Sequence, residues 1–352
     1  MKLAGEWHRS ITRTADGAGV RILDQRLLPW EARWVELRSA AAAEQAIREM
    51  WTRGAPLIGA TAAYGLAMAL AAGDELDAAY AQLLAARPTA VNLKWALDRI
   101  AEAVRNLPLD QRPTAAFARA DAIADEDVAL NQAIGRHGLE LLRALHAKAP
   151  DRPVNILMHC NPGWLATVDY GTATAPIYLA HDEGLPVHVW VDETRPRNQG
   201  ALLTAFEFAG HGVPHTVITD NAGGHLMMQG RVDAVMVGTD RVTANGDVCN
   251  KIGTYLKALA AADNGVPFYV ALPYTTFDPA TATGRDVPIE ERSSDEVVFA
   301  PAEGGAARLT LSGAANPAFD VTPARLVTAY ITERGVVDRA GLAALASAPD
   351  AA

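Results

Sequence analysis

The chain has 352 residues, of which half are hydrophobic and a fifth are charged, and its formal net charge is −10. This composition is typical of a globular protein, and the length predicts two domains. The acidic balance excludes nucleic acid as the main partner, because phosphate backbones are bound by basic surfaces. The two cysteines are too few for a disulfide framework, and we recognise neither a leader peptide nor a membrane-spanning stretch. We therefore expect a cytoplasmic protein that binds no membrane.

The first part of the chain, residues 1–147, is predicted to be a mainly helical domain with a small β hairpin. Runs of β-branched residues on both sides of the glycine-rich residues 16–19 indicate the hairpin. Helical periodicity starts near residue 41 and continues to about residue 145. The expected helices cover residues 43–50, 58–70, 76–86, 91–107 and about 114–145.

The second part, residues 153–352, is predicted to be a Rossmann-like α/β domain with a parallel sheet, and residues 147–153 a linker. Short apolar runs alternate here with helical patterns, which favours parallel strands covered by helices on both faces. The expected strands cover residues 154–160, 187–193, 215–220, 234–240 and 267–273.

Reactive or polar residues follow four of these strands, at residues 159–161, 192–194, 220–221 and 239–241. Ligands of open α/β sheets bind beyond the carboxyl ends of the strands, so these residues predict one shared site. The alternative is that they only cap the following helices. A dinucleotide enzyme is disfavoured, because no glycine fingerprint follows a strand and no P-loop lysine is present.

Cys160 and Asp240 are the candidate catalytic residues of this site. A thiol at a strand end, before a glycine turn and a helix, has its thiolate stabilised and serves as a base or nucleophile. Asp240 closes an apolar strand, and a carboxyl at an apolar rim has a raised pKa and delivers a proton. The alternatives are a buried, inert cysteine and an aspartate that caps a turn.

A metal site is not expected. The candidate zinc ligands lack the close pairs that zinc sites use, and Cys249 is interpreted as inert. These candidate ligands are His159, Cys160, His225, Asp240 and Cys249.

Three cationic segments point to a phosphorylated small molecule held between the domains. Arg53 precedes a helix that opens near Pro56, Arg87 stands before another helix, and Asn250 and Lys251 are expected to begin a helix over 252–262. Helix N-termini and cationic side chains bind phosphate together, and domain interfaces commonly hold such sites. Solvated surface side chains are the alternative for each segment taken singly.

These motifs, together with others further along the chain, carry a resemblance that runs in order from about residue 5 to residue 337. The chain resembles the methylthioribose-1-phosphate isomerase family. That family shares its fold with the regulatory subunits of the eukaryotic initiation factor 2B exchange factor and with archaeal ribose-1,5-bisphosphate isomerase. The matching motifs are residues 53–59, 87–93, 159–161, 166–173, 192–197, 199–201, 237–241, 244–247, 250–255, 288–292 and 316–323.

The resemblance implies a homodimer, without metal or organic cofactor, that converts 5-methylthioribose 1-phosphate to 5-methylthioribulose 1-phosphate in methionine salvage. It places catalysis on Cys160 and Asp240. It places substrate contacts on seven residues: Arg53, Gly54, Ala55, Arg87, Gln199, Asn250 and Lys251. The chain departs from the usual family pattern at Pro162, Trp164, Asn198, Thr239 and Cys249.

Two other functions remain open from the sequence. A sister isomerase acting on 5-deoxyribose 1-phosphate or ribose 1,5-bisphosphate is one, and for the bisphosphate Arg195 or Arg197 would bind the second phosphate. A non-catalytic regulatory subunit of a nucleotide-exchange factor is the other. That function predicts loss of the cysteine–aspartate pair, yet both residues are present.

Overall fold

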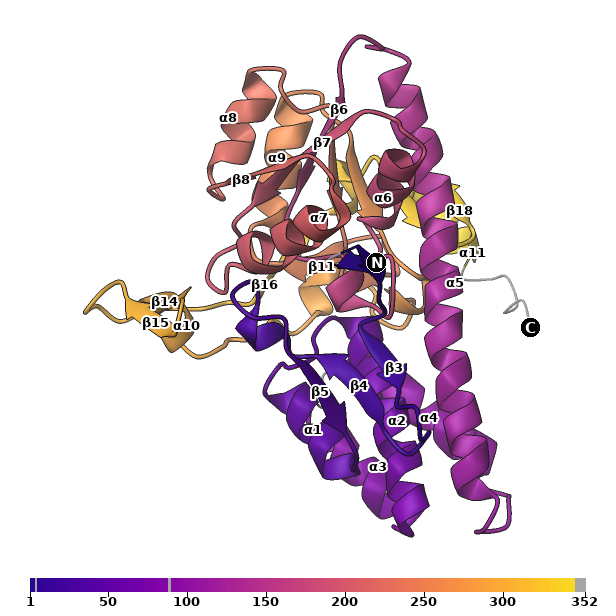
Figure 1. Cartoon of the computed structure of the whole chain (residues 1–352). Helices are drawn as coiled ribbons and strands as arrows, with labels where there is room; N and C mark the ends of the chain where they lie inside the picture. Colours follow the sequence, from indigo (N-terminus) through magenta and orange to yellow (C-terminus); the bar gives the residue numbers. More distant parts are fainter. Residues whose placement is uncertain (4, 88–89, 346–352) are drawn as a thin grey trace. The chain divides into compact units, whose positions relative to one another are not determined.

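A computed structural model describes residues 1–3, 5–87 and 90–345 and shows a mixed α/β protein with two compact units (Figure 1). Unit 1 consists of Met1–Asn131 and Gly163–Gly171, and unit 2 of Gln132–Pro162 and the residues from Thr172 onward. This division differs from the expected one at residues 147–153. The first boundary falls inside a long helix, and the segment Gly163–Gly171 belongs to unit 1.

Unit 1 contains the expected hairpin, extended by a third strand. β3 (Ile11–Arg13) and β4 (Val20–Leu23) pair antiparallel, and β5 (Trp34–Leu37) pairs with the other side of β4. Gly17, with a φ of 70°, lies in the turn between the first two strands. The shorter elements of this region are β1 (Lys2–Leu3), β2 (Glu6–Trp7) and a 3₁₀ turn, η1 (Gln25–Leu27).

The five expected helices are confirmed, with small shifts at their ends. Ser39 accepts a hydrogen bond from Ala42 N and so caps the first of them. The last helix is continuous over 35 residues and contributes to both units. The helices are α1 (Ala40–Arg48), α2 (Ala55–Ala72), α3 (Leu76–Ala85), α4 (Val91–Val104) and α5 (Arg112–His146).

Helix α2 is the core of unit 1. It is long and apolar enough to span a membrane by length and composition, which corrects the expectation that no such stretch exists. Its residues from Leu57 to Leu70 are all buried, however, against helices α1, α3 and α4 and the hairpin sheet. A helix that is apolar all round belongs to a protein core when its neighbours cover it, and α2 fits that description.

Unit 2 contains a seven-stranded sheet in the order β18-β17-β12-β9-β6-β7-β8, parallel except for β18. The five expected strands are confirmed, each shorter at its carboxyl end than expected; β17 and β18 were not expected. The strands are β6 (Val154–Met158), β7 (Val187–Asp192), β8 (His215–Ile218), β9 (Ala234–Val237), β12 (Phe268–Ala271), β17 (Ala329–Thr332) and β18 (Gly335–Val337).

Helices cover this sheet. α8 and α9 pack side by side (Figure 1), and their apolar residues share a core cluster with Leu157, Val235 and Val270 of the sheet. α6 and α7 contact β7 and β8. The helices of unit 2 are α6 (Ala175–Asp182), α7 (Ala205–His211), α8 (Ala222–Met228), α9 (Thr254–Asp263), α10 (Asp295–Val298) and α11 (Arg339–Leu345).

A second sheet of unit 2, in the order β13-β10-β11-β16, corrects one expectation. Asn250 and Lys251 end strand β11 instead of beginning a helix, because α9 starts only at Thr254, after Gly253 with its φ of 103°. Cys249 lies inside the same strand. The strands are β10 (Arg241–Thr243), β11 (Val248–Lys251), β13 (Phe277–Asp278) and β16 (Phe319–Thr322).

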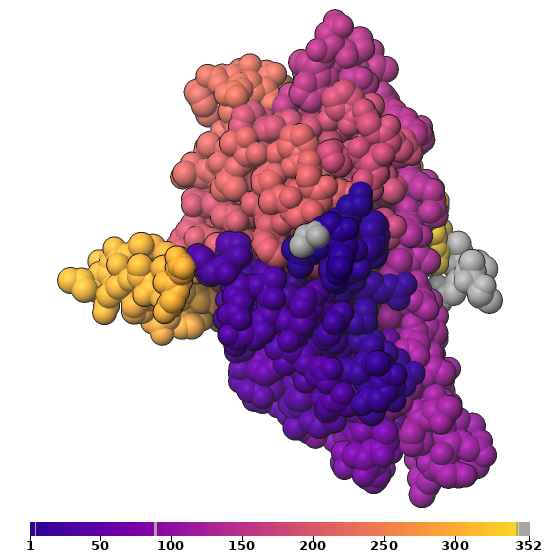
Figure 2. Space-filling model, viewed as in Figure 1, coloured from indigo at the N-terminus to yellow at the C-terminus, as the bar shows by residue number. Residues whose placement is uncertain are grey.

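The remaining elements of unit 2 are short. β14 (Phe299–Ala302) and β15 (Gly305–Arg308) form a hairpin that projects from the rest of its unit (Figures 1 and 2). The turns of helical type are η3, a π-helix (Gly200–Thr204), and the 3₁₀ turns η4 (Tyr274–Thr276), η5 (Gly284–Asp286) and η6 (Ala324–Leu326). One further 3₁₀ turn, η2 (Trp164–Ala166), belongs to the segment in unit 1.

Candidate active site

Cys160 lies two residues beyond the carboxyl end of β6, as expected. Its backbone has a φ of 63°, a left-handed conformation that non-glycine residues rarely adopt. The residue is 9% exposed, and its thiol donates a hydrogen bond to Gln199 Oε1 over 3.5 Å. The structure therefore brings together the catalytic candidate and the one substrate-contact residue that no sequence pattern had indicated.

Gln199 reaches Cys160 because of the turn that follows β7. The turn ends in the π-helix η3, which starts at Gly200. A Cβ on Gly200 would lie 1.7 Å from Asp192 O, so only glycine fits there. π-helical turns occur frequently at functional sites, and this one sets the position of the residue before it.

A buried charged cluster lies at the same sheet edge, next to Cys160 in the chain. His159 Nδ1 is 2.9 Å from Asp192 Oδ2, and His159 Nε2 donates to Ile252 O over 2.8 Å. Lys257 Nζ is 3.2 Å from the same Asp192 oxygen. Burial raises the pKa of Asp192 above its ordinary value, although the His159 hydrogen bond and the Lys257 charge oppose the rise. The cluster fixes the end of β6 against that of β7.

Within the described part of the chain, one group of side chains has the spacing of a metal site: potential ligand atoms of His159, Asp192 and Asp220 lie within 4.8 Å of one another. Asp192 Oδ2 and both Asp220 carboxylate oxygens already have protein partners, whereas the buried Asp192 Oδ1 accepts no hydrogen bond. Asp220 accepts hydrogen bonds from Thr194 N and Arg195 N, and the Lys257 ammonium supplies the positive charge beside Asp192. The donor set therefore fits an internal ion pair better than a metal centre.

Asp240 lies three residues beyond β9, and its backbone N donates to Cys249 O over 3.1 Å. Its side chain is exposed, which corrects the expectation of an apolar setting for this carboxyl. Burial, and next the charge of Asp240, raise the pKa of the neighbouring Cys249 thiol to about 12. Cys249 thus stays a neutral thiol at physiological pH, in line with its interpretation as inert.

Asn250 and Lys251 continue along β11 from Cys249, and both are buried. Asn250 Nδ2 donates to Thr254 Oγ1, and Lys251 Nζ donates to Ala318 O and lies 5.0 Å from the centre of the Phe319 ring. The bond from His159 to Ile252 O joins this strand end to the Cys160 turn. The five candidates of unit 2 therefore lie on segments that meet at one sheet edge.

The other candidates belong to unit 1. Gly54 is the N-cap of α2 with a φ of 87°, and a Cβ there would lie 2.4 Å from Ala166 O. Arg53 precedes it, and Ala55 is the first residue of the helix, so the guanidinium and the positive end of α2 lie next to one another in the chain. Arg87 is half-buried, four residues before α4; its neighbours in the motif, residues 88–89, lie outside the described part of the chain.

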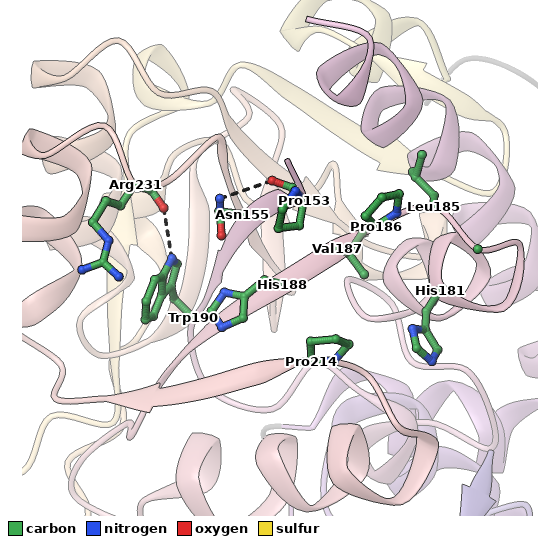
Figure 3. A pocket seen from close by; sticks show the side chains of 11 residues that line it. Pro153, Asn155, His181, Leu185, Pro186, Val187, His188, Trp190, Pro214 and Arg231 are labelled. Carbon is green, nitrogen blue, oxygen red and sulfur yellow. Dashed lines mark hydrogen bonds between the residues drawn. The ribbon is translucent and has the colours of Figure 1, made fainter. Parts of the chain in front are cut away.

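A hollow of about 660 Å³ lies at the other end of the same sheet (Figure 3). Asn155, His188 and Arg231, near the amino ends of β6, β7 and β9, are among the residues that line it. Trp190 donates to Arg231 O, and the Arg231 guanidinium lies over the indole ring at 4.7 Å. None of the predicted site residues lines this hollow, and parallel sheets of this type bind ligands at the opposite edge.

Comparisons with known proteins agree over nearly the whole chain. The sequence model of the initiation factor 2 subunit family matches residues 51–339. A methylthioribose-1-phosphate isomerase from Sinorhizobium medicae is 59% identical, covering 98% of this chain and 99% of that protein. The protein of the same name from Brucella anthropi is 60% identical, covering 96% of each.

Solved structures agree as well. The crystal structure of 5-methylthioribose 1-phosphate isomerase from Pyrococcus horikoshii has a TM-score of 0.85 and 41% identity, covering 94% of this chain and 93% of that one. A structure from A. fulgidus, described as the delta subunit of translation initiation factor eIF-2B, has a TM-score of 0.80 and 37% identity, covering 94% and 96%. The chain belongs to the initiation factor 2 subunit family, in the branch whose relatives are methylthioribose-1-phosphate isomerases.

Proposed function

We propose that this protein is an aldose–ketose isomerase that converts 5-methylthioribose 1-phosphate to 5-methylthioribulose 1-phosphate, a step of methionine salvage. The observation that carries the proposal is the sequence identity of 59% and 60%, over almost the full length of the chain, to proteins named for this reaction. The position of Cys160 at the carboxyl edge of the sheet, in contact with Gln199, supports the proposal, because its thiol is a group that can act as a base.

The substrate imposes two requirements on the site. The phosphate on the anomeric oxygen prevents ordinary opening of the sugar to a free aldehyde. The bond between C1 and the ring oxygen must therefore break with protonation of that oxygen, and a hydrogen must then move from C2 to C1. One acid and one base with separate positions satisfy both requirements.

In the proposed mechanism, Asp240 donates a proton to the ring oxygen as the bond from C1 breaks. Cys160, as thiolate, removes the proton from C2, and the electron pair of that bond forms an enol between C1 and C2. Asp240 recovers a proton from the hydroxyl on C2 while Cys160 returns its proton to C1, which yields the ketone. Because Asp240 is exposed in the structure, we propose that the bound substrate itself desolvates this carboxyl and raises its pKa.

The remaining candidates would bind and orient the substrate. Arg53, Arg87 and Lys251 bring positive charge for the phosphate, and the N-terminus of α2 at Gly54 and Ala55 brings backbone N–H groups. Gln199 and Asn250 carry amides suited to sugar hydroxyls. Binding energy from the phosphate positions the reacting carbons. We also propose that the enzyme acts in the cytoplasm as a homodimer, without a metal or organic cofactor.

The decisive experiment is an assay of three sugar phosphates side by side: 5-methylthioribose 1-phosphate, 5-deoxyribose 1-phosphate and ribose 1,5-bisphosphate. We expect the first to give the highest kcat/KM, measured by NMR of the ketose product. Cys160→Ser and Asp240→Asn should each reduce kcat by roughly 10²–10⁴-fold, the usual contribution of general acid or base catalysis. Cys249→Ala, which removes the other thiol, should keep the parent activity. Cys160→Ser with an unchanged kcat would refute the assignment.

The surroundings of the turn after β7 weigh against the bisphosphate as substrate. Arg197 Nη1 is bound to Glu296 Oε1 at 2.8 Å, and Arg195 donates to Val297 O and Pro196 O. Both guanidiniums that were expected to bind a second phosphate therefore already have protein acceptors. The regulatory-subunit alternative, favoured by the likeness to the A. fulgidus structure, predicts that none of the three sugar phosphates is turned over.

A further inference from the structure

The backbone at Cys160 is held from both sides by threonine hydroxyls. Cys160 N donates to Thr194 Oγ1 over 2.8 Å, and Thr204 Oγ1 donates to Cys160 O over 2.7 Å. Both threonines are fully buried. The residue between them has a φ of 63°, in the left-handed region that a side chain with a Cβ disfavours. The two hydroxyls therefore bind the two backbone groups of the residue with the unfavourable conformation.

Each hydroxyl is itself fixed by a second hydrogen bond. Thr194 Oγ1 donates to Asp192 O over 3.1 Å, at the end of β7. Thr204 Oγ1 accepts from Asn161 Nδ2 over 3.1 Å, and the same amide donates to Glu207 Oε1 over 2.8 Å. Because donors and acceptors are satisfied along this buried chain of bonds, its members cannot rotate freely.

The bonds also connect Cys160 to the element that carries its partner. Thr194 lies in the turn that leads to Gln199, and Thr204 is the last residue of the π-helix that follows Gln199. The two threonines thus tie the backbone of Cys160 to both ends of the segment that presents Gln199 Oε1 to its thiol.

We propose that Thr194 and Thr204 are positioning residues that hold Cys160 in its left-handed conformation and so aim its thiol at the substrate. Neither threonine has to touch the substrate. The inference deepens the proposed function, on which its catalytic part rests, whereas the conformational part stands on the structure alone. Misplacement of a catalytic group lowers the rate of the chemical step more than it weakens ground-state binding.

The test compares Thr194→Val and Thr204→Val, which remove a hydroxyl at nearly constant shape, with Thr194→Ser and Thr204→Ser, which keep it. We expect each valine variant to lose about tenfold in kcat, which corresponds to about 1.4 kcal/mol, with KM little changed. Each serine variant should recover most of the loss. Thr332→Val is the matched control, because Thr332 is equally buried and its hydroxyl donates to Gly335 O over 3.0 Å, outside this chain of bonds.

A second readout does not depend on isomerase activity. We expect alkylation of Cys160 by iodoacetamide, followed by mass spectrometry of its peptide, to become several times faster in the valine variants, because a released loop exposes the thiol. The serine variants and Thr332→Val should react at the parent rate. If the parent fails to turn over the sugar phosphate but these rates behave as expected, the proposed function fails and the positioning role stands.

A third comparison tests the conformational part of the proposal even if the valine variants fail to fold. With the left-handed conformation held in place, Cys160→Gly should unfold at a higher urea concentration than Cys160→Ala, the reverse of the usual effect of glycine. If Cys160→Gly unfolds at a lower urea concentration than Cys160→Ala, the proposal is overturned. Valine variants with the parent kcat and alkylation rate, or serine variants as impaired as the valine ones, overturn it as well.

Discussion

At the scale of single residues, the partner of the Cys160 thiol bears directly on how hydrogen moves between C2 and C1. The thiol donates to an amide oxygen of Gln199 and is only 9% exposed, so a proton taken up by Cys160 exchanges with solvent through a restricted path. A thiolate base therefore predicts partial exchange, whereas a direct hydride shift, the alternative for this chemistry, predicts none.

We accordingly expect deuterium at C1 in a fraction of the ketose formed in D₂O. The fraction can be measured by mass spectrometry and NMR of product isolated at low conversion, with product incubated alone in D₂O as the control for later exchange. Gln199→Ala, which opens the space beside the thiol, should raise the incorporated fraction. Product without deuterium at C1 in both proteins would contradict the role of Cys160 as base and favour the hydride shift.

The sequence predicts the place of Cys160 well, because a polar turn that follows an apolar parallel strand lies at the carboxyl edge of the sheet. It does not predict that Gln199 meets the thiol. That contact depends on how the turn after β7 folds back, which no periodicity records. The exposure of Asp240 could not be predicted either, since it depends on neighbours distant in the sequence.

At the scale of elements, the π-helix after β7 depends on one glycine. A Cβ on Gly200 would lie 1.7 Å from Asp192 O, so Gly200→Ala must displace the turn that carries Gln199. We expect a loss of about 2–3 kcal/mol in the free energy of unfolding, in the range of overpacked sites, together with a fall in kcat. Urea unfolding monitored by circular dichroism measures the first effect.

Gly224→Ala serves as the control for that prediction. Gly224 lies in α8, where a Cβ would lie 3.5 Å from the Ala260 side chain, an ordinary contact. This variant should unfold within about 0.5 kcal/mol of the parent or be slightly more stable, because alanine favours helices. Equal stabilities for Gly200→Ala and Gly224→Ala would show that η3 tolerates a side chain.

Strand β11 shows where local patterns mislead. Its residues are buried throughout, so it lacks the alternation that marks a half-exposed strand, and Asn250 and Lys251 resemble the polar start of a helix. A signal for the strand was nevertheless present. Asn245 and Gly246 form a dipeptide typical of hairpin turns, and the structure has β10 and β11 antiparallel on either side of it.

At the scale of the whole molecule, the chain changes unit three times: inside α5 and on both sides of Gly163–Gly171. Hydrogen bonds within unit 1 hold that segment. Ser10 Oγ donates to Trp164 O, and Gln25 Nε2 donates to Leu165 O. Length and periodicity predict two units and their fold classes. They do not predict that a segment next to Cys160 belongs to the other unit, because two of its partners, Ser10 and Gln25, are more than a hundred residues away.

One buried carboxyl makes the stability of this arrangement depend on pH. Asp127, on α5, accepts a hydrogen bond from Val168 N of the segment over 2.7 Å. Burial raises the pKa of Asp127 from 3.8 to about 7, although that hydrogen bond opposes the rise. The folded protein then binds a proton that the unfolded chain has lost between about pH 4 and pH 7. The contribution of protonated Asp127 to the free energy of unfolding is therefore fully present below about pH 4. It falls as the pH rises from 4 and is lost once the pH has passed through 7.

Asp127→Asn should remove this dependence, since the amide keeps an acceptor for Val168 N and carries no charge. We expect the variant to resemble the parent at pH 5 and to exceed it at pH 8 by a margin on the order of 2 kcal/mol in the free energy of unfolding. Urea titrations followed by tryptophan fluorescence measure the effect in unit 1, because every tryptophan except Trp190 lies there. Asp125→Asn, at an exposed carboxylate two residues away, should show the same difference from the parent at both pH values. A constant gap between Asp127→Asn and the parent from pH 5 to pH 8 would mean that Asp127 is ionised throughout, and that the segment Gly163–Gly171 is held by a buried charge.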